Sequence, residues 1–360
     1  MTGVTATRIA VGGEQPYEVV VGTGVLAELP SLVGPAARTV VVIHARGLAA
    51  IAQPACEILQ AAGYRVHAEE IPDGEAAKDI DVVTRLWSRL AARRISRLEV
   101  IIGLGGGAVT DVAGFTAATW LRGIRVVLVP TTLLAIADAA IGGKTAINIP
   151  AGKNLVGAFH PPAGVLADTA VLASLPPAEY VSGLAEVIKA GFIADPVILE
   201  LIESDPAAAA RPGGRHEREL IERAVAMKAA VVSADLREAG PREMLNYGHT
   251  LGHAIERAEG YRLRHGEAVA IGMVYAAELS RLAGRLDEQT ARRHRAILAA
   301  VGLPTSYRAG AWQQLRETMA VDKKARAGGL RLVVLDALAR PAILADPPED
   351  LLARAYAEVS

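Results

Sequence analysis

Three histidines lie close together in the second half of the sequence, and their spacing suits metal chemistry. His249 and His253 are four residues apart in "LNYGHTLGHAIE", and His265 follows in "RLRHGEAVAIG". On a helix, residues four apart project from one face. Two histidines and one carboxylate with open positions would form a catalytic metal site. Thr250 stands where a zinc protease helix carries its glutamate, so that chemistry is not expected.

The spacing does not fix the carboxylate of such a site. Glu256 and Glu267 stand beside the same histidines, while Glu186 and Lys189 share one face of a predicted helix in "GLAEVIKAG". The pattern predicts a divalent metal and leaves open which two histidines and which carboxylate bind it. The competing interpretation is that these histidines are structural. The scattered histidines are interpreted as structural by default: His44, His67, His160, His216 and His294.

Lysine is scarce in this chain. Of 38 cationic side chains seven are lysines, which leaves 31 arginines. A lysine that remains can mark a place where a compact ammonium is needed for a phosphate, a tight pocket or proton transfer. Lys144 and Lys153, with Asn154, lie in the glycine-rich "DAAIGGKTAINIPAGKNLVGAFH". This loop predicts an anionic, oxygen-rich substrate. The alternative is a solvated loop with incidental charges.

A glycine-rich turn in the first half predicts nucleotide binding, and the alternative is that it is merely a tight strand-to-helix turn. "GLGGGAVTDVAGF" follows a predicted strand and opens a predicted helix. Glycines let the backbone approach a phosphate, and the helix N-terminus offers free N–H groups. Ala108 occupies the third glycine position of the usual dinucleotide pattern, so the match is incomplete. The paired hydroxyls of Thr131 and Thr132 follow the next strand, where they can bind the nucleotide or cap a helix.

The elements that must position these residues divide the chain in two. The first half alternates strand-like and helix-like segments, with "YEVVVG" as an edge strand or hairpin arm and a buried strand at 38–43, which predicts parallel βαβ units. From about Pro176 long amphipathic helical patterns dominate, and a short β-like pair, "LRLVVLD" and "PAILAD", closes the chain. We expect an α/β Rossmann-like nucleotide-binding domain over residues 1–175 and a mainly α-helical metal- and substrate-binding domain over residues 176–360.

Composition excludes several classes of protein. Half of the residues are hydrophobic and 21% are charged, as in a globular protein. The net charge of −1 argues against nucleic-acid binding through a basic face. The single cysteine, Cys56, fits a reducing compartment. We find no secretory signal and no run of about 20 apolar residues that would span a membrane. These features predict a cytoplasmic protein.

Taken together, the motifs resemble those of the 3-dehydroquinate synthase family of sugar phosphate cyclases. The resemblance covers nearly the whole chain, and its strongest pieces are "IPDGEAAKD", "GLGGGAVTDVAGFTAATWLRG", "VPTTLLAIADAAIGGKTAIN", "GKNLVGAFH", "GLAEVIKAG", "LNYGHTLGHAIE" and "HGEAVAIGM". It implies conversion of 3-deoxy-D-arabino-heptulosonate 7-phosphate to 3-dehydroquinate and phosphate in the shikimate pathway. It also implies catalytic NAD, a divalent metal (zinc or cobalt) and a homodimer.

The resemblance implies roles for individual residues. The metal ligands would be Glu186, His249 and His265. Substrate would contact Arg122, Lys144, Asn154, Lys189, Lys228, Arg242, Asn246, His253 and either Lys324 or Lys323, a choice that the motif does not decide. NAD would contact Asp73, Gly74, Glu75, Lys78, Gly105, Gly106, Gly107, Ala108, Val109, Thr110, Asp111, Thr131, Thr132, Asp138, Lys144, Lys153, Val171, Leu172, Ala173 and Ser174.

The chain departs from the family pattern at a few positions. His44 stands where the family commonly has an aspartate that contacts the adenosine ribose. Ala139 and Ala140 replace a serine pair, and Ala146 replaces a frequent glycine. Arg242, Leu245 and Asn246 match the dehydroquinate type. The alternatives are another sugar phosphate cyclase, such as an aminodehydroquinate, inosose or valiolone synthase, a metal-dependent NAD polyol dehydrogenase, and a non-catalytic regulatory protein.

Overall fold

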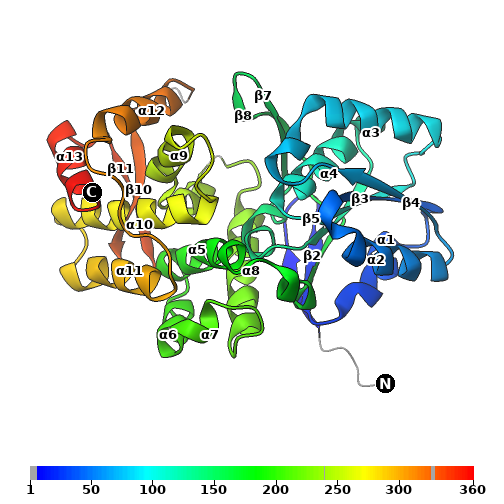
Figure 1. The fold of residues 1–360 in the computed structure, drawn as a ribbon, viewed down its shortest axis with the longest axis horizontal. Coiled ribbons are helices and arrows are strands. Elements are labelled where there is room, and N and C mark those ends of the chain that lie inside the picture. Colours follow the sequence, from blue (N-terminus) through cyan, green and yellow to red (C-terminus); the bar gives the residue numbers. More distant parts are fainter. Residues whose placement is uncertain (1–5, 239, 326–328) are drawn as a thin grey trace. The chain divides into compact units, whose positions relative to one another are not determined.

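The chain forms two compact units (Figure 1). The computed structural model describes residues 6–238, 240–325 and 329–360, without the side chains of 321–325. One unit extends to Leu175 and includes Lys228–Arg237, and the other comprises Pro176–Met227 and the chain from Glu238 onward. The segment Lys228–Arg237 packs with the first unit although it follows Pro176 in the sequence.

The first unit is built on a sheet of seven strands in the order β1-β2-β9-β6-β5-β3-β4. β1 and β2 form an antiparallel hairpin, and all other pairs are parallel. The central strands are continuous apolar runs because both faces of the sheet are covered. The strands are β1 (Thr7–Val11), β2 (Tyr17–Gly22), β3 (Thr39–Ala45), β4 (Arg65–Ile71), β5 (Val100–Gly105), β6 (Arg125–Pro130) and β9 (Gly164–Asp168).

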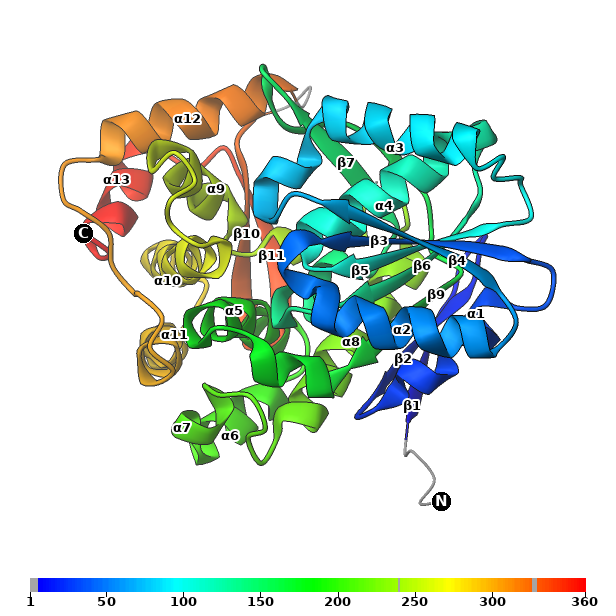
Figure 2. The same cartoon turned by 45° about the vertical axis from the view of Figure 1, so that its right-hand side comes forward.

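Helices cover the two faces of this sheet (Figure 2). Leu29 and Leu59 pack with Val42 and Ile102 in one core cluster. On the other face, a Cβ at Gly103 would lie 2.6 Å from the Cβ of Ala113, which shows how closely α4 approaches β5. The predicted parallel α/β domain is therefore confirmed. The helices are η1 (Val25–Glu28), α1 (Leu29–Val33), η2 (Arg46–Leu48), α2 (Ala49–Ala61), η3 (Gly74–Lys78), α3 (Ile80–Ala92), α4 (Gly107–Thr119), η4 (Trp120–Arg122), η5 (Ala135–Ala139) and η6 (Thr169–Ser174).

A separate hairpin of β7 (Lys144–Ile149) and β8 (Gly152–Phe159) belongs to the same unit. It carries Lys153 and Asn154 beside the turn, where Asn154 adopts a positive φ of 56°. The sequence predicted a glycine-rich loop here, and the structure gives that loop an ordered β-ladder.

The second unit is mainly helical, as predicted, and is organised around α10 (His265–Leu282). α10 is apolar on most sides because it contacts α5, α9, α11, α13 and β10. β10 (Arg331–Ala337) and β11 (Arg340–Ala345) form the predicted β pair, and the two strands are antiparallel. The other helices are α5 (Pro177–Ile193), α6 (Val197–Ser204), α7 (Pro206–Ala209), α8 (Glu217–Ala234), η7 (Pro241–Asn246), α9 (His249–Ala258), α11 (Glu288–Ala300), α12 (Trp312–Ala325) and α13 (Glu349–Ala357). Within the described part of the chain, no helix is both long and apolar enough to cross a bilayer.

Candidate active site

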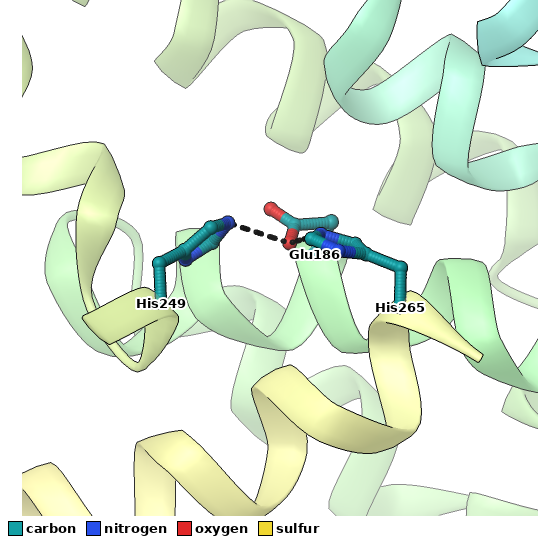
Figure 3. A group of neighbouring side chains, drawn as sticks. All are labelled: Glu186, His249 and His265. Carbon is teal, nitrogen blue, oxygen red and sulfur yellow. Dashed lines mark ion pairs between the residues drawn. The ribbon is translucent and has the colours of Figure 1, made fainter. Parts of the chain in front are cut away.

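Glu186 lies in the middle of the buried helix α5 and faces two histidines (Figure 3). Its Oε1 is 3.4 Å from His249 Nε2 and 3.3 Å from His265 Nε2. Neither carboxylate oxygen accepts a hydrogen bond from any described residue, although Oε2 forms an ion pair with Lys189 one turn along the helix. Lys189 compensates Oε2, whereas Oε1, which faces the histidines, is left without a hydrogen bond, and a buried carboxylate oxygen in that state is costly unless a second cation lies close to it.

Glycines let the two histidines reach that carboxylate. Gly248 precedes His249 with a φ of 79°, and a Cβ there would lie 2.9 Å from the backbone nitrogen of Met273 on α10. Gly266 follows His265, and a Cβ there would lie 1.8 Å from the carbonyl oxygen of Ser182 on α5. Each histidine therefore begins a helix at a point where two backbones are in close contact.

The second ring nitrogen of each histidine is already engaged. His249 Nδ1 lies 3.0 Å from the carbonyl oxygen of Tyr247, and His265 Nδ1 lies 3.2 Å from Glu256 Oε2. Because carbonyl and carboxylate oxygens accept hydrogen bonds, each Nδ1 carries the proton in these contacts. His249 Nε2 can then present a lone pair toward Glu186, and His265 Nε2 can do so once a metal displaces its proton, which is the usual arrangement of histidines that bind a metal.

The surroundings shift the pKa values of this cluster in different directions. Burial, assisted by the Lys189 ammonium, lowers the pKa of His249 well below its ordinary value. Burial also opposes a charge on His265, but Glu186 and Glu256 outweigh it and raise its pKa to about 10. Burial likewise opposes ionisation of Glu186, yet Lys189 and the histidines hold its pKa well below the ordinary range. The carboxylate is thus ionised at neutral pH.

The ligand atoms of Glu186, His249 and His265 all lie within 4.8 Å of one another. One carboxylate and two imidazoles at this spacing fit a divalent cation with open positions. His253, Glu256 and His265 form a second such group, which is more exposed. Glu267 is separate, because its carboxylate accepts the Arg264 backbone N–H at 2.9 Å and caps α10.

Two other predicted substrate residues of the second unit, Arg242 and Asn246, lie on η7, shortly before His249 in the sequence. Arg242 is buried in η7, and Asn246 at the end of η7 donates from Nδ2 to Glu238 Oε1 at 2.9 Å. The sequence had not singled out Glu238, whose φ of 57° gives it an unusual backbone conformation. Lys323 and Lys324 belong to α12, but their side chains lie outside the described residues.

Three of the seven lysines are buried beside carboxylates. This agrees with the expectation that the few lysines of this chain mark places where a compact ammonium is needed. Lys78, Lys189 and Lys228 are each at most 5% exposed. Lys78 pairs with Asp111 and also donates to Asn154 Oδ1, while Lys228 pairs with Asp138. These lysines occupy tight, carboxylate-lined positions. Lys144 and Arg122 are exposed, and Lys153 Nζ lies 3.4 Å from Glu75 Oε1.

The predicted nucleotide residues of the first unit lie at strand ends. Gly105 closes β5, and a Cβ there would lie 2.5 Å from Val109 Cγ2, so the turn into α4 is tight. Gly106 and Gly107 open α4, which also carries Ala108, Val109, Thr110 and Asp111. Burial raises the pKa of Asp111, against the opposing effect of Lys78. Asp73 and Gly74 begin η3, which includes Glu75 and Lys78, and η6 contains Val171, Leu172, Ala173 and Ser174.

Thr131 and Thr132 have different environments. Thr131 is buried and donates its backbone N–H to the Gly105 carbonyl at 2.9 Å. The Thr132 hydroxyl oxygen accepts the backbone N–H of Ala135 at 3.1 Å, which is the capping role considered from the sequence. Ala139 faces the glycine turn, 3.2 Å from where a Cβ at Gly107 would lie. His44 is a buried side chain one residue before the end of β3, and its Nδ1 lies 3.0 Å from the carbonyl oxygen of Ala45.

Two family profiles match adjoining parts of the chain. The profile described as 3-dehydroquinate synthase N-terminal matches residues 68–182, and that described as 3-dehydroquinate synthase C-terminal matches residues 183–325.

The chain belongs to the 3-dehydroquinate synthase family.

A curated member of the family and two solved structures resemble this chain over nearly its full length. A 3-dehydroquinate synthase of Thermobifida fusca is 64% identical over 358 residues, 99% of this chain and 97% of that protein. The solved structure of a 2-deoxy-scyllo-inosose synthase, complexed with carbaglucose-6-phosphate, NAD+ and Co2+, has a TM-score of 0.89 at 28% identity and covers 99% of this chain and 100% of its own. The 2-epi-5-epi-valiolone synthase of Streptomyces hygroscopicus, with NAD+ and Zn2+, has a TM-score of 0.88 at 25% identity, covering 98% and 99%. The resemblance in the motifs and the predicted fold are both confirmed.

Proposed function

We propose that this chain is a 3-dehydroquinate synthase, a phosphate-eliminating lyase that converts 3-deoxy-D-arabino-heptulosonate 7-phosphate to 3-dehydroquinate with catalytic NAD and a divalent metal. The observation that carries the proposal is the buried Glu186 carboxylate facing two histidine nitrogens, in a chain 64% identical to a 3-dehydroquinate synthase. The cofactors named for the two solved neighbours, NAD+ with Co2+ or Zn2+, support the same pair here.

Glu186, His249 and His265 would hold the metal, because their donor atoms are of the types that Zn2+ and Co2+ accept and lie within 4.8 Å of one another. The glycine turn after β5, with Lys78 and Asp111, would hold NAD. When bound, the metal supplies Lewis acidity toward a substrate hydroxyl, and NAD supplies a hydride acceptor that is regenerated. The other proposed NAD contacts keep the roles given from the resemblance.

The chain's own side chains would handle charge and protons. Lys189, buried against Glu186, keeps that carboxylate ionised at neutral pH. Lys144, Arg122 and Lys228 carry the positive charge that a phosphate requires, and Asn154 offers an amide to its oxygens. His253 is exposed one turn beyond His249 and is the imidazole suited to transfer a substrate proton. Arg242, Asn246 and Lys324 remain proposed substrate contacts.

We further propose that the enzyme works as a homodimer in the cytoplasm. The single cysteine supports a reducing compartment. The dimer rests on the family resemblance, and analytical ultracentrifugation of the purified protein tests it directly. A monomer at micromolar concentration would overturn that part of the proposal without affecting the reaction.

The test of the reaction compares two products. The purified protein is mixed with the heptulosonate phosphate, NAD and Zn2+, and phosphate release and NADH absorbance are followed together. We expect many phosphates per NAD and no net NADH. Net NADH formation would support the polyol dehydrogenase instead. Equal phosphate release from the amino analogue or from glucose 6-phosphate would support another cyclase of the same fold.

A further inference from the structure

Outside the three clustered histidines, the second unit contains another histidine that is fully buried. His294 on α11 is 0% exposed and stacks on the ring of Phe192, with centroids 3.5 Å apart and an interplanar angle of 10°. Its Nδ1 lies 2.8 Å from the carbonyl oxygen of Thr290, and its Nε2 lies 2.8 Å from the hydroxyl of Tyr247. Because the carbonyl oxygen only accepts, Nδ1 carries the proton and Nε2 accepts the tyrosine O–H.

Burial keeps this ring uncharged. It lowers the pKa of His294 to about 3, against a hydrogen bond to Thr290 that favours the charged form. Nε2 therefore remains a hydrogen-bond acceptor at all physiological pH values. The Tyr247 hydroxyl is buried as well, so the bond between the two side chains is shielded from water.

Tyr247 connects this buried pair to the metal centre. Its backbone carbonyl accepts the Nδ1–H of His249 at 3.0 Å, and its backbone N–H donates to Met244 at 3.2 Å. The side chain of Tyr247 thus anchors the peptide that determines where His249 Nε2 points. Phe192, on which His294 stacks, lies on α5, the helix that also carries Glu186.

We propose that the Tyr247–His294 pair is a positioning device for the metal ligand His249, an inference that rests on the metal centre proposed above. His265 has a carboxylate partner whose charge favours its orientation, whereas the partner of His249 is a neutral carbonyl with no such charge. The Tyr247 carbonyl, which we call the neutral support of His249, must therefore be held in place by packing. The buried hydrogen bond from the Tyr247 hydroxyl to His294 fixes its position. Groups that orient a metal ligand from behind typically change metal affinity by about 10-fold or more.

The experiment measures Zn2+ affinity of the full-length, metal-free protein by competition with a chromophoric chelator. We expect Tyr247→Phe and His294→Leu to weaken Zn2+ binding by about 10-fold. His294→Gln should remain within about 3-fold of the wild type, because the glutamine amide oxygen can replace Nε2 as the acceptor. Circular dichroism and the melting temperature of each metal-free variant establish that it is folded.

Tyr180→Phe is the matched control. Tyr180 is also buried, lies on α5 and donates its hydroxyl to Glu217 Oε1 at 2.9 Å, but it has no contact with Tyr247 or His249 among the bonds of the described residues. We expect this variant to lose stability and keep wild-type Zn2+ affinity. The control separates loss of a buried tyrosine hydrogen bond from loss of ligand positioning.

The possible outcomes separate the inference from the proposed function. Wild-type affinity in Tyr247→Phe, or equal weakening by Tyr180→Phe, would overturn the positioning role. If Tyr247→Phe does not fold, the two His294 variants decide, and equal affinities of the Gln and Leu forms would overturn it. A wild-type protein that binds no stoichiometric Zn2+ would instead overturn the metal centre itself.

Discussion

His249 and His265 present the same ring nitrogen to the same oxygen of Glu186, yet the chain supports the two rings by different means. The proton on His249 Nδ1 is held by a neutral backbone carbonyl, that of Tyr247. The proton on His265 Nδ1 is held by the carboxylate of Glu256. The first support depends on a peptide fixed by buried packing, and the second depends on charge.

This difference has an electrostatic consequence. The pKa of His249 is lowered by burial and Lys189, whereas that of His265 is raised to about 10 by the two carboxylates that flank it, despite burial. One side of the cluster is thus kept neutral and fixed in position. The other side is made more basic, which strengthens an imidazole as a ligand. Within one cluster, His249 is thus oriented by a fixed backbone carbonyl and His265 by a charged carboxylate.

The largest expected effect comes from deleting one of the proposed metal ligands. We predict that His265→Ala abolishes metal-dependent phosphate release, because Glu186 would retain a single imidazole partner. His67→Ala, a partly buried histidine on β4 in the first unit, is the control and should retain activity. Phosphate release is measured together with bound metal by atomic absorption. Near-normal turnover by His265→Ala without stoichiometric metal would exclude this ligand assignment.

A smaller effect should follow from removing only the charge behind His265. Glu256→Gln keeps an oxygen that can accept the His265 proton and loses the negative charge, so we predict Zn2+ binding about 10- to 100-fold weaker. Glu267→Gln alters a carboxylate near the same helix start that belongs to the helix cap, and it should bind Zn2+ normally. Chelator competition measures both. If Glu256→Gln weakens binding less than Tyr247→Phe does, charge is not the stronger support.

The elements of the fold were predictable because their residue patterns are simple. Apolar strands such as "VIIGLG" and amphipathic helices gave the α/β and helical halves. The strand order was not predictable, since β9 lies between β2 and β6 although β7 and β8 precede it in the chain. The association of Lys228–Arg237 with the first unit was not predictable either. The sequence of α8 is one continuous helical pattern, and it gives no sign that the boundary between the two units falls inside this helix.

The site was predictable from residues only in part. Spacing brought His249 and His253 together, but it could not select Glu186, which α5 delivers from more than sixty residues away. That choice came from the family resemblance, and the assignment of ligands stays a prediction. The partner histidine His294 was interpreted as structural, and its burial agrees with this. No local pattern connects it to Tyr247, because the two are brought together by tertiary packing.

The smallest expected effect is on the pH dependence of folding stability, through His294, which holds the Tyr247 side chain. The pKa of His294 is about 3 in the folded protein, against an ordinary value of 6.5; burial lowers it, and Arg293 adds to the effect. Tyr247 is the titratable group whose hydroxyl contacts the ring. Between pH 3 and pH 6.5 the His294 ring binds a proton in the unfolded chain but not in the folded one. The contribution to stability is therefore complete above pH 6.5 and is lost as the pH falls toward 3.

At pH 5, one and a half units below the unfolded pKa, this loss amounts to about 2 kcal/mol. His294→Gln has no such proton to gain, so its stability should decline less on acidification than that of the wild type. Denaturant unfolding of both metal-free proteins at pH 7 and pH 5 measures the difference, and carboxylates elsewhere titrate equally in the two. Parallel pH profiles would mean that folding does not lower the pKa of His294, so that the ring is charged at pH 5 in the folded protein as well. At that pH its Nε2 could not accept the Tyr247 hydroxyl, and the peptide that supports His249 would lose this hydrogen bond.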